Sequence, residues 1–198
     1  DESANLANPL IFAAATATNS AWRGAALFAV QGTALVDLGT TGTQRAAMGT
    51  LGAPLAPSSG LLFEPEATAT IDVFAQDLGF TDTDISGIAN GANRVLIGGE
   101  LLQFLRAEPL GSERWRLAGL LRGRGGTEPA AALGHPAQTP VIMIDDRLTA
   151  LDPLLVPPLA SSRVAAIGTG DAEPVIAPLA NPGLSCRPPC PVHARAWL

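Results

Sequence analysis

The stretch that decides the fold is Asn93-Arg-Val-Leu-Ile-Gly-Gly-Glu-Leu-Leu-Gln-Phe-Leu-Arg-Ala107. Its two apolar runs flank the turn residues Gly98-Gly99, which is the pattern of a β-hairpin. A second reversal, at 109–112, leads into Arg114–Leu121, where charged and apolar side chains alternate. Together these segments predict a three-stranded antiparallel meander from about residue 94 to residue 121.

The same alternation assigns an inner and an outer face to each strand. In 68–74, Ala69 and Ile71 fall on the apolar face, opposite Thr70 and Asp72. We therefore expect residues 68–121 to form antiparallel sheet. The side chains that we expect in its core are Trp115, Leu117, Phe104, Val95 and Ile97.

Weaker patterns extend the β structure in both directions. Gln31-Gly32 predicts a hairpin between 24–30 and 33–38. Thr127 is a plausible N-cap for a helix over 128–133, with Pro129 in its first turn and Gly134 at its end. The remaining short apolar runs that read as strands are 9–17, 45–51, 141–144, 163–167 and 175–179.

The expected fold class is therefore mainly β: an antiparallel meander, in a barrel-like or sandwich module, with one or two short helices. We divide the chain into a β-rich N-terminal part (1–60), a core module (61–180) and a Pro-rich linker (181–198). The chain begins with Asp rather than Met, and we expect it to be a piece of a longer protein.

Composition excludes several classes of protein. Hydrophobic residues make up 47% of the 198 positions and charged residues 15%, which argues against a disordered chain. The 21 Gly and 17 Pro argue against a long helical bundle. A net charge of −6 argues against general binding of nucleic acid, which requires a basic surface. No apolar run is long enough to predict a membrane span.

Charges are segregated along the chain. Residues 64–84 hold six acids and no Arg, whereas 94–124 hold six Arg and three Glu. The two segments could attract each other inside one fold, or they could form a contact surface in an assembly. The candidate contact residues are Arg122 and Arg124, on a Gly-rich turn, together with Arg114 and Arg116. The alternative is that these side chains pair with Glu108, with Glu128 or with the acidic segment.

Three groups of residues were weighed as chemical sites. Cys186, Cys190 and His193 offer three zinc ligands without a fourth nearby, and the Cys pair would need a turn to form a disulfide. Asp82-Thr-Asp84-Ile-Ser-Gly87 opens like a calcium loop but has Asn93 at the last ligand position; the alternative is a turn with Asx caps. His135 is a single loop histidine, more typical of a structural residue than of a catalytic one.

No other chemical motif is complete. The Gly-x-Ser-x-Gly elbow of a serine hydrolase does not occur in the sequence, and Arg122-Gly-Arg-Gly-Gly126 does not have the Lys-Ser/Thr ending of a phosphate-binding loop. No pair of acidic residues in the sequence stands out as the two facing carboxylates that a glycosidase needs. We therefore expect no enzyme activity, no cofactor and no metal ion.

One stretch carries a family resemblance. It contains Ala89-Asn-Gly-Ala-Asn-Arg94, then Gly99-Glu-Leu-Leu-Gln-Phe104, and finally Leu120-Leu-Arg-Gly-Arg-Gly-Gly-Thr-Glu128. These pieces resemble the large baseplate hub protein of gene-transfer-agent and siphophage tails, often described as phage tail protein. The sequence departs from that family at Gly125, where a second Arg is usual. Weaker matches extend toward both ends of the chain.

The resemblance implies a structural role and transfers no catalytic residue. It implies a virion protein of the tail tip, made in the bacterial cytoplasm, that contacts other baseplate proteins and forms a ring-like homo-oligomer, a trimer, in the intact protein. Two alternatives remain open: a tail-associated cell-wall hydrolase and a carbohydrate-binding receptor module. The first would show a cleft with catalytic side chains, and the second an exposed aromatic platform.

Overall fold

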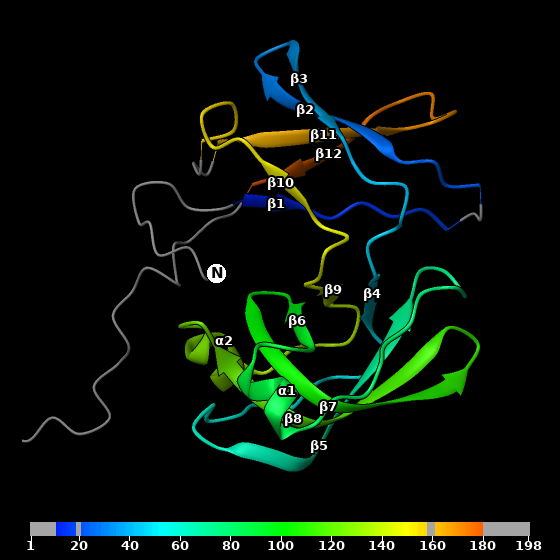
Figure 1. The fold of residues 1–198 in the computed structure, drawn as a ribbon. Coiled ribbons are helices and arrows are strands. Elements are labelled where there is room, and N and C mark those ends of the chain that lie inside the picture. The colour runs from blue at the N-terminus through cyan, green and yellow to red at the C-terminus, as the bar shows by residue number, and fades with distance from the viewer. Residues whose placement is uncertain (1–10, 19–20, 158–160, 180–198) are drawn as a thin grey trace, which may run out of the picture.

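The computed structural model describes residues 11–18, 21–157 and 161–179. Six antiparallel strands form a closed barrel, which is the lower half of the molecule in Figure 1. The strands pair around the barrel in the order β4-β5-β8-β7-β6-β9. The protein is therefore mainly β, as the sequence predicts. The barrel strands are β4 (Met48–Leu51), β5 (Phe63–Val73), β6 (Arg94–Ile97), β7 (Glu100–Gly111), β8 (Arg114–Arg124) and β9 (Pro140–Met143).

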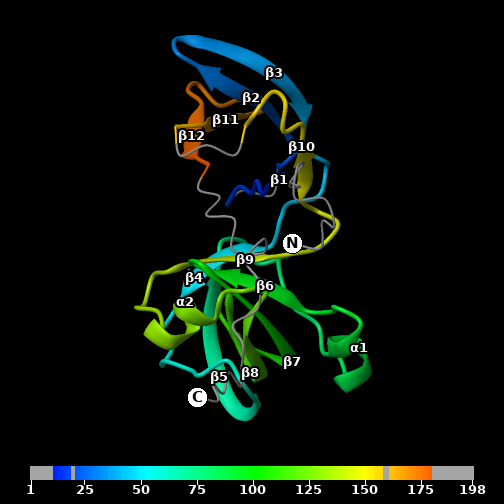
Figure 2. The ribbon, with the colours of Figure 1, turned by 90° about the vertical axis from the view of Figure 1, so that its left-hand side faces the viewer.

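A second set of strands packs above the barrel (Figure 2). A four-stranded sheet has the order β12-β11-β2-β3, and a two-stranded ribbon pairs β1 with β10. Each of these sheets combines strands that precede the barrel in the sequence with strands that follow it. Their bounds are β1 (Ile11–Ala13), β2 (Ala25–Gln31), β3 (Ala34–Thr40), β10 (Thr149–Leu151), β11 (Arg163–Gly168) and β12 (Val175–Pro178).

The predicted meander is confirmed as β6, β7 and β8, and its last strand runs on to Arg124. The N-terminal hairpin is also confirmed, but its two-residue turn is Gly32-Thr33, one position later than expected, because Gln31 pairs with Ala34. The predicted helix is α2 (Glu128–Leu133). The expected division into domains stays a prediction.

A second helix interrupts the predicted sheet between β5 and β6. It is α1 (Ile85–Ala89), and it begins where the Asp84 carboxylate accepts a hydrogen bond of 2.7 Å from the Gly87 amide. The Asp82 carboxylate accepts one of 2.7 Å from the amide of Ala107. Asp84 is thus a helix cap, as the Asx alternative to a calcium loop expects, whereas Asp82 ties this loop to the distant strand β7.

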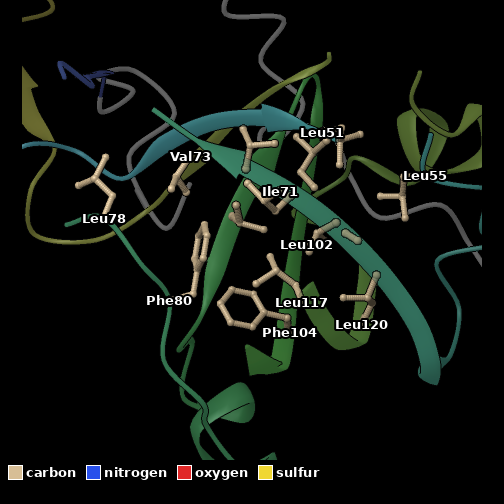
Figure 3. Close-up of a cluster of buried hydrophobic side chains, with 14 of the residues drawn as sticks. Leu51, Leu55, Ile71, Val73, Leu78, Phe80, Leu102, Phe104, Leu117 and Leu120 are labelled. Carbon is tan, nitrogen blue, oxygen red and sulfur yellow. The ribbon is translucent and has the colours of Figure 1, made fainter. Parts of the chain in front are cut away.

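Four of the side chains expected in the core are buried there, Phe104, Leu117, Val95 and Ile97, and Trp115 packs against them partly buried. Figure 3 shows Phe104 and Leu117 within this cluster. Phe80 stands edge-on to two rings, with centroids 5.8 Å from Phe104 and 5.9 Å from Trp115. Such edge-to-face pairs stabilise a core by about 0.5–1.5 kcal/mol each beyond area burial. The aromatic cluster therefore fixes the loop around Phe80 against the inner faces of β7 and β8.

The connection between the two sets of strands is held by Arg45. Its side chain is buried, donates 2.8 Å to the carbonyl oxygen of Ala17 and forms an ion pair with Asp77. The amide of Ala46 donates to the carbonyl oxygen of Ala15 at 3.0 Å. The segment that leads into β4 is therefore anchored both to residues before it in the sequence, Ala15 and Ala17, and to one after it, Asp77. In the described part of the chain, no helix has the length and apolarity needed to cross a membrane.

The backbone of β5 lies close to Gly49 in β4 and leaves no room for a side chain there. A Cβ at this position would lie 2.9 Å from the carbonyl carbon of Asp72 and would overlap its oxygen. We expect Gly49→Ala to lower the free energy of unfolding by about 1–3 kcal/mol, the usual cost of overpacking. Urea denaturation measures this loss.

Gly42→Ala is the matched control, because a Cβ at Gly42 meets only the Gln44 amide nitrogen, at 4.0 Å. It should leave the midpoint of denaturation nearly unchanged. Equal losses in the two variants would contradict the close approach of β4 and β5.

Candidate functional site

Arg114 and Arg116 lie on the outer face of β8, as the alternation predicts, and each has a partner within the chain. Arg114 Nε and Nη2 donate to the two carboxylate oxygens of Asp72, at 2.5 and 3.0 Å. Arg116 Nη1 donates to Glu108 at 2.9 Å. The four side chains form a charged ladder across β5, β8 and β7, and both arginines remain about half exposed. Exposed pairs of this kind contribute little to stability, about 0–1 kcal/mol.

Arg122 does not belong to that surface, and the expectation that it contacts a partner is wrong. Its side chain is 1% exposed and lies inside the barrel wall. The reason is that the alternation of inward and outward residues in β8 shifts by one position. Leu117 points inward, but after Gly119 the inward residues are Leu120 and Arg122. Gly119 has φ +66°, a conformation that L residues with a side chain rarely adopt, and it shifts the alternation by one residue.

The partner of Arg122 is Glu100, a residue that the sequence analysis did not single out. Arg122 Nε and Nη2 donate to Oε1 and Oε2 of Glu100 at 2.6 and 2.7 Å, in a bidentate pair. The Gly123 amide donates to Oε1 at 2.9 Å, and His135 Nε2 lies 2.8 Å from Oε2. Arg122 Nη1 also reaches the carbonyl oxygen of Ala56 at 3.1 Å. We call Glu100, Arg122 and His135 the buried charge cluster.

The buried charge cluster holds four segments together: the start of β7, the end of β8, the loop after α2 and the loop before β5. Glu100 is 0% exposed, so its ionised form would be costly without compensation. Burial raises the pKa of Glu100, but the hydrogen bonds from Arg122, Gly123 and His135 together with the charge of Arg122 outweigh it and lower the pKa below the ordinary 4.5. An ionised carboxylate only accepts hydrogen bonds, so His135 Nε2 acts as a donor here.

This arrangement leaves the cluster without a free catalytic group. Four donors occupy the two oxygens of Glu100, and the Nε2 of His135 is one of them. The interpretation of His135 as a structural residue therefore fits its geometry. The clue in the sequence was a single Glu between a Gly-Gly turn and an apolar strand, since a charge in a buried strand must have a partner.

Arg124 is the exposed member of the Gly-rich turn. Its side chain is exposed and forms no ion pair within the described ranges, whereas its carbonyl oxygen accepts 2.7 Å from the Thr127 hydroxyl. The backbone that carries Arg124 is thus tied to the start of α2, while the guanidinium group is available to a partner. Cys186, Cys190 and His193 lie outside the described residues. Among the described residues, no three His, Cys, Asp or Glu side chains gather as a metal site would require.

The barrel segment is similar to a known protein family. A family model described as Rcc01698-like, C-terminal, matches residues 46–142. The match begins just before β4 and ends within β9, so the matched residues are those of the barrel. No curated protein matches the chain. Glu100, Arg122 and His135 lie within the matched range.

Removing the charge of Glu100 should destabilise the barrel strongly. In Glu100→Gln the shape is kept, but Arg122 becomes an uncompensated buried charge, which costs about 3–5 kcal/mol. Glu108→Gln is the matched control, because it breaks an exposed pair between the same two strands and should cost less than about 1 kcal/mol. Urea denaturation at pH 7 compares them. Similar losses in both variants would show that the buried pair carries no special weight.

The lowered pKa of Glu100 also predicts a pH dependence. A carboxyl whose pKa is lower in the folded state stabilises the protein fully above its unfolded pKa, about 4.5, and loses that contribution as the pH falls through the folded pKa. Denaturation between pH 7 and pH 3 should therefore show a steeper loss in the wild type than in Glu100→Gln. A direct readout in the wild type is the carbon-13 shift of the Glu100 carboxyl, whose midpoint should lie below 4.5. A midpoint above 4.5 would contradict the assignment.

Proposed function

We propose that the chain is a structural component of a phage or gene-transfer-agent tail tip, a piece of the baseplate hub. The role is the one implied by the resemblance of residues 80–128 to the baseplate hub family. The supporting observation in the structure is how the buried polar groups are used. Each of the seven buried polar or charged side chains in the described part of the chain has a partner within the chain: Arg45, Ser58, Glu100, Gln103, Arg122, Thr127 and His135.

That use of polar groups favours a scaffold over an enzyme. Active sites characteristically keep a titratable side chain poised in a cleft, with a pKa matched to its task. Here the buried polar groups tie segments of the barrel together. Trp115 packs edge-on to Phe80 rather than forming a sugar-binding platform. The structure therefore gives no specific support to the hydrolase or the receptor alternative.

In the intact protein we propose contacts with other baseplate proteins and a homo-oligomer, a trimer, at the tail tip of the virion. Arg124 is the contact residue that the geometry favours, because the turn presents an exposed guanidinium group beside a fixed backbone. Arg114 and Arg116 can exchange Asp72 and Glu108 for carboxylates of a neighbour at little cost, since such exposed pairs are weak. Guanidinium groups favour carboxylates because two parallel hydrogen bonds can form.

The role itself is tested in purified tail particles. Immunoelectron microscopy with an antibody raised against the chain should label the tail tip. If the protein is missing from purified particles and is recovered only in the soluble fraction, the proposal is wrong.

Arg124→Glu should impair tail assembly without destabilising the protein. The charge reversal places like charges at a contact with carboxylates, whereas the folded chain loses no ion pair among the described residues. Counting tails by electron microscopy in cells that carry the variant gene measures assembly, and the melting temperature should change by less than about 2 °C.

Arg163→Glu is the control, because Arg163 is also exposed but lies at the start of β11, outside the charged segment. It should leave tail counts near the wild-type level. Normal tail counts with Arg124→Glu would remove Arg124 from the contact surface, and a collapse of its melting temperature would show an internal role instead.

A further inference from the structure

The two ends of strand β8 present exposed charges of opposite sign. Arg124 ends the strand on the side of α2, whereas Glu113 lies in the turn just before the strand begins, on the opposite side of the barrel (Figure 1). Both side chains are exposed, and neither forms an ion pair in the part of the chain that the structure describes. These two groups are too far apart to meet within one copy, but they can meet when two copies come together.

The backbone beneath each of these charges is fixed. The carbonyl oxygen of Arg124 accepts a hydrogen bond of 2.7 Å from the Thr127 hydroxyl. The carbonyl oxygen of Glu113 accepts one of 2.8 Å from the amide of Val73. Each charged group is thus presented from a defined place on the surface, which lowers the entropy that is lost when a partner binds.

The turn that carries Glu113 is not the most stable one for its geometry. Gly111 pairs with Arg114, so Ser112 and Glu113 form a two-residue hairpin turn. Their φ angles are +50° and +65°, in the left-handed region where Asn-Gly is the usual choice. A residue with a Cβ is strained there, and glycine is not. A glutamate at this position indicates a use for its side chain outside the fold.

Exposed apolar side chains lie beside Glu113. Leu110 is near the end of β7, next to the turn, and it is 39% exposed. Phe74 follows Val73, whose amide donates to Glu113, and it is also 39% exposed. We call Phe74, Leu110 and Glu113 the tip surface. It combines an aromatic and an aliphatic side chain with one carboxylate.

Exposed apolar side chains lie beside Arg124 as well. Leu61 and Leu62, in the loop before β5, are 67% and 74% exposed. This loop runs along the end of β8, because a Cβ at Gly60 would lie 3.6 Å from the Cα of Gly123. We call Leu61, Leu62 and Arg124 the helix-end surface. It combines two aliphatic side chains with one guanidinium group.

We propose that the tip surface of one copy binds the helix-end surface of a second copy, head to tail. Glu113 accepts hydrogen bonds from Arg124 of the neighbouring copy, and the apolar side chains of the two surfaces pack together. Aromatic residues and arginine are enriched in interfaces of this kind. The occupant is a second copy because this chain itself carries the complement of each surface, in charge and in apolar character.

The contact is heterologous, since the two surfaces differ. Each copy in a pair therefore keeps one surface free, and repeated contacts form a ring if the rotation between copies closes. The inference rests on the proposed homo-oligomer and names the surfaces that hold it together.

Crosslinking in solution tests the contact in the full chain, with Cys186 and Cys190 both changed to Ser. One preparation carries Ser59→Cys, next to Gly60, and another carries Ser112→Cys, next to Glu113; both serines are exposed. At millimolar concentration, a bismaleimide should give at least about threefold more crosslinked dimer in a mixture of the two variants than in either variant alone. Equal yields in the mixture and in the single variants would overturn the head-to-tail contact.

Charge reversal tests the ion pair itself. Arg124→Glu in the Ser59→Cys chain, or Glu113→Arg in the Ser112→Cys chain, should lower the yield about threefold to tenfold, and the two reversals together should restore it. Arg163→Glu is the matched control, because Arg163 is exposed on β11, away from both surfaces, and it should leave the yield unchanged. Single reversals without effect, or a double reversal that restores nothing, overturn the pairing.

Glu113→Gly separates the contact from the fold. It should raise the melting temperature, because glycine adopts a positive φ without strain, and it should lower the crosslinking yield as Glu113→Arg does. A lower melting temperature, or an unchanged yield, contradicts the role assigned to Glu113.

Failure of this proposal is distinct from failure of the tail-tip role. Labelling of purified tail particles does not depend on Glu113, so it can succeed where the crosslink fails. Crosslinking takes place in solution, so it can succeed where the tail particles carry no label.

Discussion

The barrel depends on a carboxylate placed where water cannot reach it. Glu100 begins β7 immediately after a tight turn, and its charge is tolerable only because Arg122, Gly123 and His135 all donate to it. The donors come from two separate segments, the end of β8 and the loop after α2, so both segments must be in place together. The buried charge of Glu100 is therefore stable only in the arrangement of strands that brings these donors to it. In this way a buried ionic group can favour one arrangement of strands over others.

Stability is distributed unevenly between the two sets of strands. The barrel has a large cluster of fully buried aliphatic and aromatic side chains, including Phe104, Leu117 and Leu120. In the second set the buried apolar cluster among the described residues contains only Ile11, Leu27 and Leu151. Burial of apolar area drives folding at roughly 25 cal/mol per Å², so the barrel supplies most of the stabilisation. The second set depends on it through the anchor at Arg45.

Sequence patterns predicted the local structure well and the long-range structure poorly. Alternation placed Trp115 and Leu117 inward because two-residue periodicity is a local property of a strand. The same rule extended past Gly119 puts Arg122 outside, since the sequence Ala-Gly-Leu-Leu is compatible with either phase. The phase becomes clear only in the structure, where Gly119 has a positive φ and Arg122 meets Glu100 inside the barrel. Closure of the barrel, where Met48 pairs with Ile142, joins segments far apart in sequence and leaves no local signal.

The barrel lies, in sequence, inside the second set of strands. β2 precedes it and β11 follows it, yet Ala29 pairs with Val164. Forming that pair in an unfolded chain would require closing a very long loop, and the loss of chain entropy grows, though slowly, with loop length. Once β4 and β9 are paired, however, the chain enters and leaves the barrel at neighbouring points, and the loop that remains is short. We therefore expect the barrel to form before the outer sheet, and we expect the outer sheet to be the first part to separate when the chain is pulled from its ends.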